Sequence, residues 1–397
     1  MLMFLSRISK ELVLLFLFVP MVSAWTAKWI NLGLDIGSSI DPPRSGHVAF
    51  GLDDKIYVFG GYAEDRDTSE RYPTNDLWCF GEEKKWTLVK PASKSQPQPR
   101  LASIALSCQL DKDTTVGLVL GGWDSQQAGT GGEILKDIQA FSSTGEDGGS
   151  WKELPVDLQE PTSRLCALPL INESTSLSSK IFIHNHRCID HVMLLDLETS
   201  KLTKQPVSGT CPSARGLHCC VQLPGTSKIV LFGGAAQIGT MSNEVFVLDT
   251  ETWVWEDCGC GESEKASDGV PSPRASPCFV ALDDKSCILF GGASRSDEGG
   301  LHGCSDTWLL ELEESKTNDG SSAKTTAKWT QLGEDKSAQE SAQAPPGRNA
   351  ATLIPFLSTP DFDEDDKEDS QFFLLSGGWY PFRTTYGDNF VLKVTKK

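Results

Sequence analysis

The sequence predicts an all-β protein, a six-bladed β-propeller with four strands in each blade and a last blade closed by an N-terminal strand. Three observations lead to this fold class. Glycine accounts for 36 of the 397 residues and recurs in pairs at the ends of short apolar runs. A fixed order of arginine, glycine pair and tryptophan returns at intervals of 51 to 74 residues. The last copy lacks its tryptophan segment, and a matching segment stands near the N-terminus.

The clearest copy of the repeat surrounds the apolar run Ile56–Phe59, which ends in Gly60-Gly61. Arg44 precedes the run and opens a first short strand, and Trp86 follows in a fourth. Short apolar runs bounded by Gly, Pro, Asp and Asn are typical of strands joined by tight turns. The copy therefore predicts a four-stranded unit whose second strand ends at the glycine pair.

The same landmarks recur in the same order along the chain. The arginines that open the six copies are Arg44, Arg100, Arg164, Arg215, Arg274 and Arg348. The glycine pairs are Gly60-Gly61, Gly121-Gly122, Gly233-Gly234, Gly291-Gly292 and Gly377-Gly378. The tryptophans are Trp86, Trp151, Trp255 and Trp329, with Trp29 before the first copy. The third copy is degenerate, because His184-Asn185 replaces the glycine pair and Leu202 the tryptophan. Repeats of this length with four strands each are propeller blades.

Each landmark has a physical role in such a blade. Paired glycines let the backbone adopt positive φ and pack closely on the neighbouring blade. A tryptophan covers the junction between adjacent sheets with a large apolar face. The Asp or Asn before each third strand is interpreted as turn chemistry.

Closure of the ring is predicted from the two ends of the sequence. The sixth copy runs out after the strand at 389–394, before a tryptophan strand. Residues 26–32 supply that strand and complete blade six, which removes an open sheet edge. We therefore expect residues 25–397 to form one domain.

This pattern resembles the kelch motif over nearly the whole chain after residue 25. The resemblance implies a propeller that binds a protein partner without catalysing a reaction. It also implies that the six arginines surround one mouth of the propeller and hold acidic side chains of a partner peptide, since a guanidinium matches a carboxylate bidentately. The alternative is that each arginine bonds the backbone of the neighbouring blade. Aromatic residues that follow the glycine pairs, Tyr62, Trp123 and Trp379, are predicted interface anchors.

Other functions remain as alternatives. An enzyme, or a binder of a sugar or other small ligand, would use the central cleft of the propeller. No set of catalytic residues is assembled by the spacing of this sequence, and we expect no cofactor. The formal net charge of −18 and the lack of a basic run argue against nucleic acid as a partner. The sequence does not predict the oligomeric state.

Histidine and cysteine give only weak signals of a site. His184 and His186 share a face if they lie in a strand, which suits imidazole ligands, but their surroundings match no standard zinc module. We therefore predict no metal. The neighbours Cys219-Cys220 and the pair Cys258 and Cys260 are interpreted as packing residues or partners in longer-range disulfides.

The N-terminal residues resemble a targeting segment. A basic start, an apolar run and the small residues Ser23-Ala24 predict a secretory signal over residues 1–24, and hence a secreted protein. Translation from Met21 would instead give a cytoplasmic protein. No stretch is long and apolar enough for a stable membrane span. The acidic run at 361–369 is expected to be a solvated loop.

Overall fold

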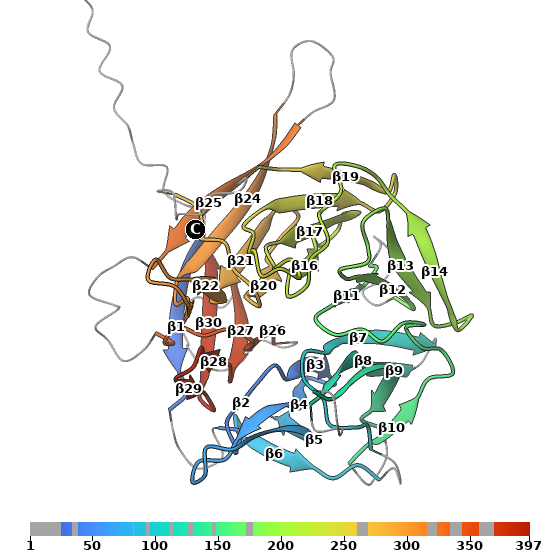
Figure 1. Ribbon diagram of the computed structural model, residues 1–397, viewed down its shortest axis with the longest axis vertical. Helices are drawn as coiled ribbons and strands as arrows, with labels where there is room; N and C mark the ends of the chain where they lie inside the picture. The colour runs from blue at the N-terminus through green and yellow to red at the C-terminus, as the bar shows by residue number, and fades with distance from the viewer. Residues whose placement is uncertain are drawn as a thin grey trace, which may run out of the picture.

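Six sheets, antiparallel except for the short pair β15–β19, are arranged around a central axis in the computed structural model, and they confirm the predicted six-bladed propeller (Figure 1). The structure describes residues 25–33, 39–81, 83–92, 96–111, 114–125, 131–144, 148–171, 178–259, 269–315, 324–333, 344–356 and 369–397. Within these ranges there is no helix, and hence no helix that could cross a membrane. The predicted signal at 1–24 and the acidic run up to residue 368 lie outside the described residues.

The blades follow one another in chain order around the axis. Blade one contains β2 (Arg44–Ser45), β3 (Val48–Leu52), β4 (Lys55–Glu64), β5 (Arg71–Phe80) and β6 (Trp86–Val89). Blade two contains β7 (Ile104–Asp111), β8 (Thr114–Asp124), β9 (Glu133–Ser142) and β10 (Ser150–Glu153). Blade three contains β11 (Cys166–Pro169), β12 (Lys180–His184), β13 (His191–Asp196) and β14 (Lys201–Pro206).

The second half of the ring repeats this plan. Blade four contains β15 (Ser208–Gly209), β16 (Cys219–Gln222), β17 (Lys228–Phe232), β18 (Val245–Asp249) and β19 (Val254–Asp257). Blade five contains β20 (Cys278–Ala281), β21 (Ser286–Phe290), the hairpin β22 (Ala293–Arg295) and β23 (Leu301–Gly303), β24 (Thr307–Ser315) and β25 (Lys324–Leu332). Blade six contains β26 (Thr352–Pro355), β27 (Ser370–Ser376), the hairpin β28 (Trp379–Tyr380) and β29 (Thr384–Thr385), β30 (Asn389–Lys396) and β1 (Trp25–Asn31). Strands β3, β7, β11, β16, β20 and β26 lie innermost (Figure 1).

The N-terminal strand closes the ring as predicted. Strand β1 pairs antiparallel with β30, from Trp25 opposite Lys396 to Asn31 opposite Phe390. It is therefore the outer strand of the sheet β1-β30-β27-β26, and the blue and red strands lie side by side in Figure 1. Trp25, the first described residue, is itself buried.

The hydrophobic core is divided among the junctions between blades. Trp151 of blade two lies with its ring centroid 4.8 Å from that of Phe59 in blade one. The corresponding centroids are 5.2 Å apart for Trp329 and Phe232, and 4.7 Å apart for Trp29 and Phe290. Each of these three tryptophans therefore packs on the aromatic residue that precedes the glycine pair of the previous blade, whereas Trp86 packs on Phe80 of its own blade, with ring centroids 5.2 Å apart.

Blade three departs from this pattern in a way that changes the predicted register. Cys166 pairs opposite His184, as Cys219 pairs opposite Phe232 and Cys278 opposite Phe290. His184 also packs against Trp255, with ring centroids 5.9 Å apart. His184 therefore takes the place of the aromatic residue, and the glycine-pair position begins one residue later than the sequence suggested.

We expect removal of one junction tryptophan to destabilise the whole ring. Trp151→Ala deletes a buried ring that touches both Phe59 and Phe141, and such truncations cost about 3–5 kcal/mol. Leu88→Ala is the matched control, because Leu88 is half exposed on the outer strand of blade one and should change stability by less than about 0.5 kcal/mol. Urea unfolding followed by tryptophan fluorescence measures the stability of both variants. Equal losses of stability in the two would contradict a role for Trp151 in packing adjacent blades together.

Candidate functional site

Five of the six repeat arginines are buried, each within its own blade. Arg44, Arg100, Arg215, Arg274 and Arg348 have exposed fractions of 2 % or less. In blade five, Arg274 donates to the Gly291 carbonyl at 3.0 Å and to both carboxylate oxygens of Asp306 at 2.7 and 2.8 Å. The four other arginines bond the first glycine of their own pair and an acidic residue in or directly before their own third strand, namely Asp76, Asp137, Glu244 and Asp388.

These contacts correct two interpretations of the sequence. These acidic residues, interpreted from the sequence as turn residues, accept hydrogen bonds from arginine, and two of them lie within the third strands. The guanidinium groups bond their own blade, and not the neighbouring blade or the surface. The structure therefore gives these five arginines a structural role, and the function proposed below does not depend on contact between them and a partner.

Arg164 differs from the other five because it does not occupy the equivalent position. Positive φ occurs two residues after each buried arginine, at Ala102 for Arg100 and at Leu217 for Arg215, but in blade three it occurs at Arg164 itself. Thr162 takes the buried position, and its carbonyl accepts from Gly122 N–H at 2.9 Å as the Arg100 carbonyl accepts from Gly61 N–H at 2.8 Å. Arg164 is exposed and lines the central channel.

The positive-φ residues form a closed ring of backbone hydrogen bonds around the axis. Each donates its N–H to the carbonyl of the equivalent residue in the preceding blade, at 2.8 to 3.1 Å. The ring runs through Gly46, Ala102, Arg164, Leu217, Ser276 and Ala350. Since every member is both donor and acceptor, the ring fixes the six blades relative to one another at one end of the channel.

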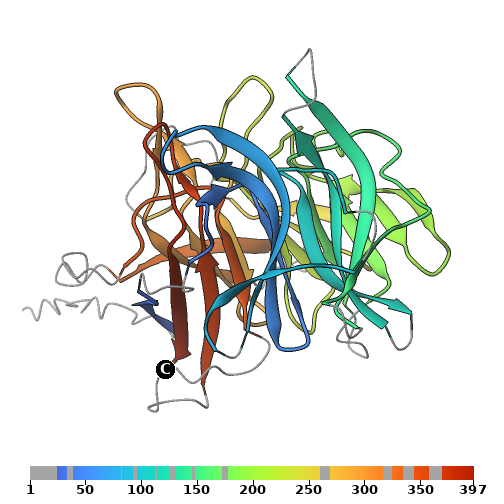
Figure 2. The same cartoon turned by 90° about the horizontal axis from the view of Figure 1, so that it is seen from below.

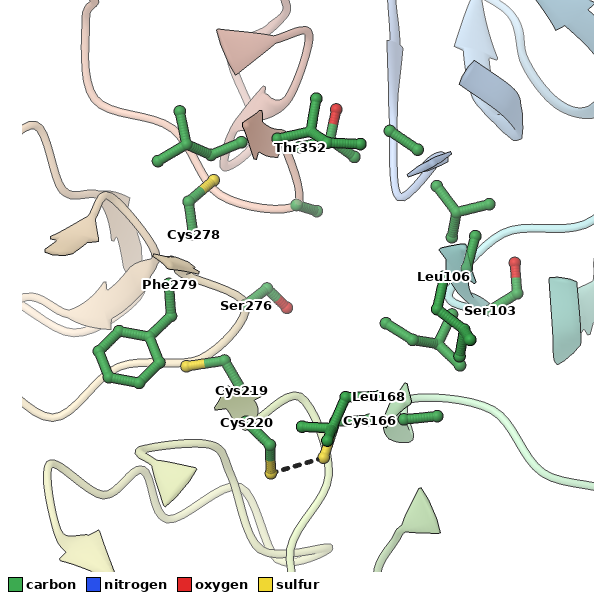
Figure 3. A pocket seen from close by; sticks show the side chains of 18 of the residues that line it. Ser103, Leu106, Cys166, Leu168, Cys219, Cys220, Ser276, Cys278, Phe279 and Thr352 are labelled. Carbon is green, nitrogen blue, oxygen red and sulfur yellow. Dashed lines mark hydrogen bonds between the residues drawn. The ribbon is translucent and has the colours of Figure 1, made fainter. Parts of the chain in front are cut away.

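The central channel has a volume of about 530 Å³ and is lined by the innermost strands of all six blades. Figure 3 shows side chains from the blades facing this space, among them Leu106, Cys166 and Thr352. Among the described residues that line it, the titratable groups are histidines, cysteines and Arg164, and none is a carboxylate. The enzyme and small-ligand alternatives stay predictions.

A cysteine–histidine cluster lies at the wall of the channel between blades three and four. The Cys166 thiol contacts Cys220 Sγ at 2.7 Å and His218 Nε2 at 3.2 Å, and Figure 3 shows the two sulfurs facing each other. His184 Nδ1 lies 3.0 Å from the same His218 nitrogen. Burial lowers the pKa of His184 to about 3 and that of His218 well below its ordinary value, so both rings are neutral. His186 does not join the cluster, and no disulfide is formed by the eleven described cysteines.

The loops that follow the second strands project on one side of the propeller, which we call the loop face (upper side of Figure 2). Here the Arg71 guanidinium lies over the rings of Tyr62 and Trp379, 4.6 and 5.0 Å from their centroids. Trp379 also contacts Phe382, with centroids 5.4 Å apart. The structure thus brings together two of the three predicted aromatic anchors, while Trp123 lies apart and donates to its own loop at Gly131.

Sequence reasoning missed the apolar side chains at the tips of this face. Phe382 is 79 % exposed and Ile238 is 88 % exposed, the two highest values among the large hydrophobic side chains that the structure describes. Ile238 borders a hollow of about 1260 Å³ between blades four and five, which Arg295 also lines. Both residues lie in loops that follow a glycine pair, and this position in the repeat is the sequence feature from which they could have been predicted to be exposed.

Comparisons with known proteins agree with this architecture. A model of the KLHDC2/KLHL20/DRC7 Kelch-repeats domain matches residues 182–352, and a Kelch motif model matches residues 43–93. The chain is a kelch-repeat β-propeller protein. Propellers of this family generally mediate protein interactions.

Similar proteins include longer chains. The flagellar outer-arm dynein alpha chain of Chlamydomonas reinhardtii is 26% identical over 69% of this chain and 6% of its own length. Adagio-like protein 1 of Oryza sativa subsp. japonica is 24% identical over 71% of this chain and 43% of its own length. Kelch domain-containing protein 2 of Bos taurus is 25% identical over 67% of this chain and 66% of its own length. The matches thus cover less than half of the first two relatives. The solved structure of YjhT aligns with a TM-score of 0.55 over 90% of this chain and 98% of that one, at 14% identity, which shows the fold alone.

Breaking one arginine–carboxylate pair should destabilise the protein strongly. Arg274→Met leaves the Asp306 carboxylate without its cation, and removal of one partner from a buried pair costs about 3–5 kcal/mol. The double variant Arg274→Met/Asp306→Leu removes both charges and should recover most of that loss. Urea unfolding at pH 7 measures the free energy of unfolding of both variants. A double variant no more stable than the single one would contradict the view that Arg274 and Asp306 stabilise the protein as a pair.

Acid should destabilise the protein through the Arg274–Asp306 pair. Burial raises the pKa of Asp306, but the hydrogen bonds and charge of Arg274 outweigh burial and hold this pKa below its ordinary value. Because the folded pKa is the lower one, the stabilisation is complete above about pH 4 and is lost as the pH falls through the folded pKa. We expect the urea midpoint to fall steeply below about pH 4, and to fall less steeply in Asp306→Asn. Identical slopes would show that the pair does not set acid stability.

Proposed function

We propose that this propeller is a non-catalytic protein-interaction module that binds a segment of a partner protein on its loop face. The observation that carries the proposal is that the two most exposed large apolar side chains of the described chain, Phe382 and Ile238, both lie on this face. Apolar and aromatic side chains at the centre of an interface supply most of its binding energy. Family membership supports the same class of function.

The charges on the loop face suggest the chemistry of the partner. Arg383 is exposed beside Tyr380, with its guanidinium 5.2 Å from the ring centroid. Arg295 is exposed across the hollow from Ile238 and donates to the Gly239 carbonyl at 2.9 Å. A guanidinium held this way still has N–H groups to offer a carboxylate. We infer that the partner segment combines apolar side chains with acidic ones, and that these arginines replace the repeat arginines as the acid-binding groups.

The blades hold this face rigid. Thr385 of blade six donates to the Glu64 carboxylate of blade one, and Arg71 donates to Ser45 Oγ at 3.0 Å while covering Trp379 of blade six. The aromatic residues around Arg71 are therefore ordered before a partner arrives. Preorganisation lowers the entropy that binding loses, so a modest contact area can give useful affinity.

Proximity labelling in cells tests this proposal. We compare the wild type with Phe382→Ser/Ile238→Ser, and with Leu88→Ser as a control that removes a half-exposed apolar side chain from an outer strand. We expect specific partners to be labelled by the wild type and the control, and to fall at least about tenfold in the double variant, since loss of interface anchors costs 1.4 kcal/mol or more. A folded double variant with an unchanged partner set would overturn the assignment of the face.

We also propose that residues 1–24 direct the chain to the secretory pathway. The small residues before Trp25 suit a signal peptidase, and cleavage after Ala24 would leave the whole of β1 to pair with β30. N-terminal sequencing of the protein purified from a eukaryotic host should then begin at Trp25. A first residue at Met1 or Met21 would contradict export by a cleaved signal.

A further inference from the structure

We propose that Cys166, Cys220 and His218 form a binding site for a thiophilic d¹⁰ cation, with Zn²⁺ as the representative ion, at the wall of the central channel. This inference is independent of the proposed partner binding, because the cluster lies inside the channel and Phe382 and Ile238 lie on the loop face.

The ligand atoms come from two neighbouring blades. Cys166 begins β11 of blade three, while His218 directly precedes β16 of blade four and Cys220 is the second residue of that strand. Successive strand residues point to opposite faces of a sheet, and Cys219 accordingly packs toward blade five while Cys220 packs toward blade three. The two cysteines that sit side by side in the sequence therefore have different surroundings, and only Cys220 reaches Cys166.

The donor set matches the cation. The two sulfurs and one imidazole nitrogen all lie within 4.8 Å of one another. Zinc bonds of about 2.3 Å to sulfur and 2.0 Å to nitrogen place tetrahedral ligands about 3.5–3.8 Å apart. The sulfurs stand at 2.7 Å and the Cys166–His218 pair at 3.2 Å. If the cysteine side chains rotate so that these ligand atoms move apart by up to about 1 Å, the site has the right size for the cation.

The imidazole presents one ring nitrogen to the sulfurs. His218 Nε2 lies 3.2 Å from Cys166 Sγ. His184 Nδ1 lies 3.0 Å from His218 Nε2. A cation that binds this nitrogen displaces the contact between the two rings and can take His184 as a fourth ligand.

The surroundings permit a positive charge and give it access. The positive charge of Arg215 acts on both histidines. Its guanidinium is paired with the Glu244 carboxylate at 2.7 Å, which offsets much of its charge. All three proposed ligands line the central channel, so a hydrated ion can reach them from solvent. Binding exchanges the two thiol protons for the metal and releases them to water.

A Cys166–Cys220 disulfide is the competing use of these sulfurs. It would join the same two atoms, but it would leave His218 and His184 without a role in the cluster. The cation instead uses every group that converges there. The two possibilities predict opposite thiol counts, and the experiment below separates them.

The test uses the full chain, purified and freed of metal under reducing conditions, and titrated with Zn²⁺ against a chromogenic chelator and with Co²⁺. We expect one equivalent of Zn²⁺ to bind and to raise the melting temperature. Co²⁺ should give sulfur-to-cobalt charge-transfer bands of two thiolates. Cys166→Ser and Cys220→Ser should each weaken Zn²⁺ binding by at least about 100-fold. Cys278→Ser is the matched control, because Cys278 is another buried channel cysteine outside the cluster.

Several results would overturn the site. One is the absence of stoichiometric binding while both thiols react with a thiol reagent. Another is the loss of two reactive thiols that returns on reduction, which identifies the disulfide. Equal weakening by Cys278→Ser would show a nonspecific effect of thiol loss. If the serine variants do not fold, the wild-type Co²⁺ spectrum decides alone, since a spectrum without charge-transfer bands excludes thiolate ligands.

Discussion

The ring of six backbone hydrogen bonds around the axis is the constraint on which the rest of the propeller depends. Each blade reaches the axis at a residue of positive φ, and this residue both donates to and accepts from its neighbours. A ring of this kind closes only if neighbouring blades approach each other closely near the axis. The Gly pairs follow from this requirement: an added Cβ at Gly60 would lie 2.8 Å from the Arg100 carbonyl of the next blade.

The buried arginines connect this ring to the body of each blade. Arg274 joins the first strand to the end of the second through Gly291 and to the start of the third through Asp306. One side chain thus holds three strand ends at a single point on the loop side. The loops beyond that point are free to vary in length and chemistry, which is where Phe382 and Ile238 occur. A rigid base with variable loops suits recognition of a partner.

Much of the fold was predictable because its signals are local and repeated. The pairs Gly60-Gly61 and Gly233-Gly234 mark strand ends directly, and the segment around Trp29 revealed the closure. Arg164 was misplaced because an arginine happens to stand two residues late in blade three. A local signal could have corrected this, since proline precedes Thr162 as it precedes Arg44.

The candidate sites were harder to predict because they depend on contacts between distant segments. Arg100 and Asp137 are joined across a stretch of variable length, so their pairing has no fixed spacing. Cys166 and Cys220 meet only because two strands of adjacent blades lie side by side. Exposure, too, is set by the fold: Ile238 is as apolar as any core residue, and only its position in a loop tip leaves it in water.

The pairing of β1 with β30 also sets how the ring responds to mechanical force. Trp25 and Lys396 lie at the same end of an antiparallel pair, so a pull that separates them breaks the ladder bonds one after another. Strands loaded in this unzipping geometry yield more easily than strands sheared along their length, where all the bonds carry the load together. A force applied between these two strand ends would therefore open the seam one bond at a time, and blade six would then lack its outer strand.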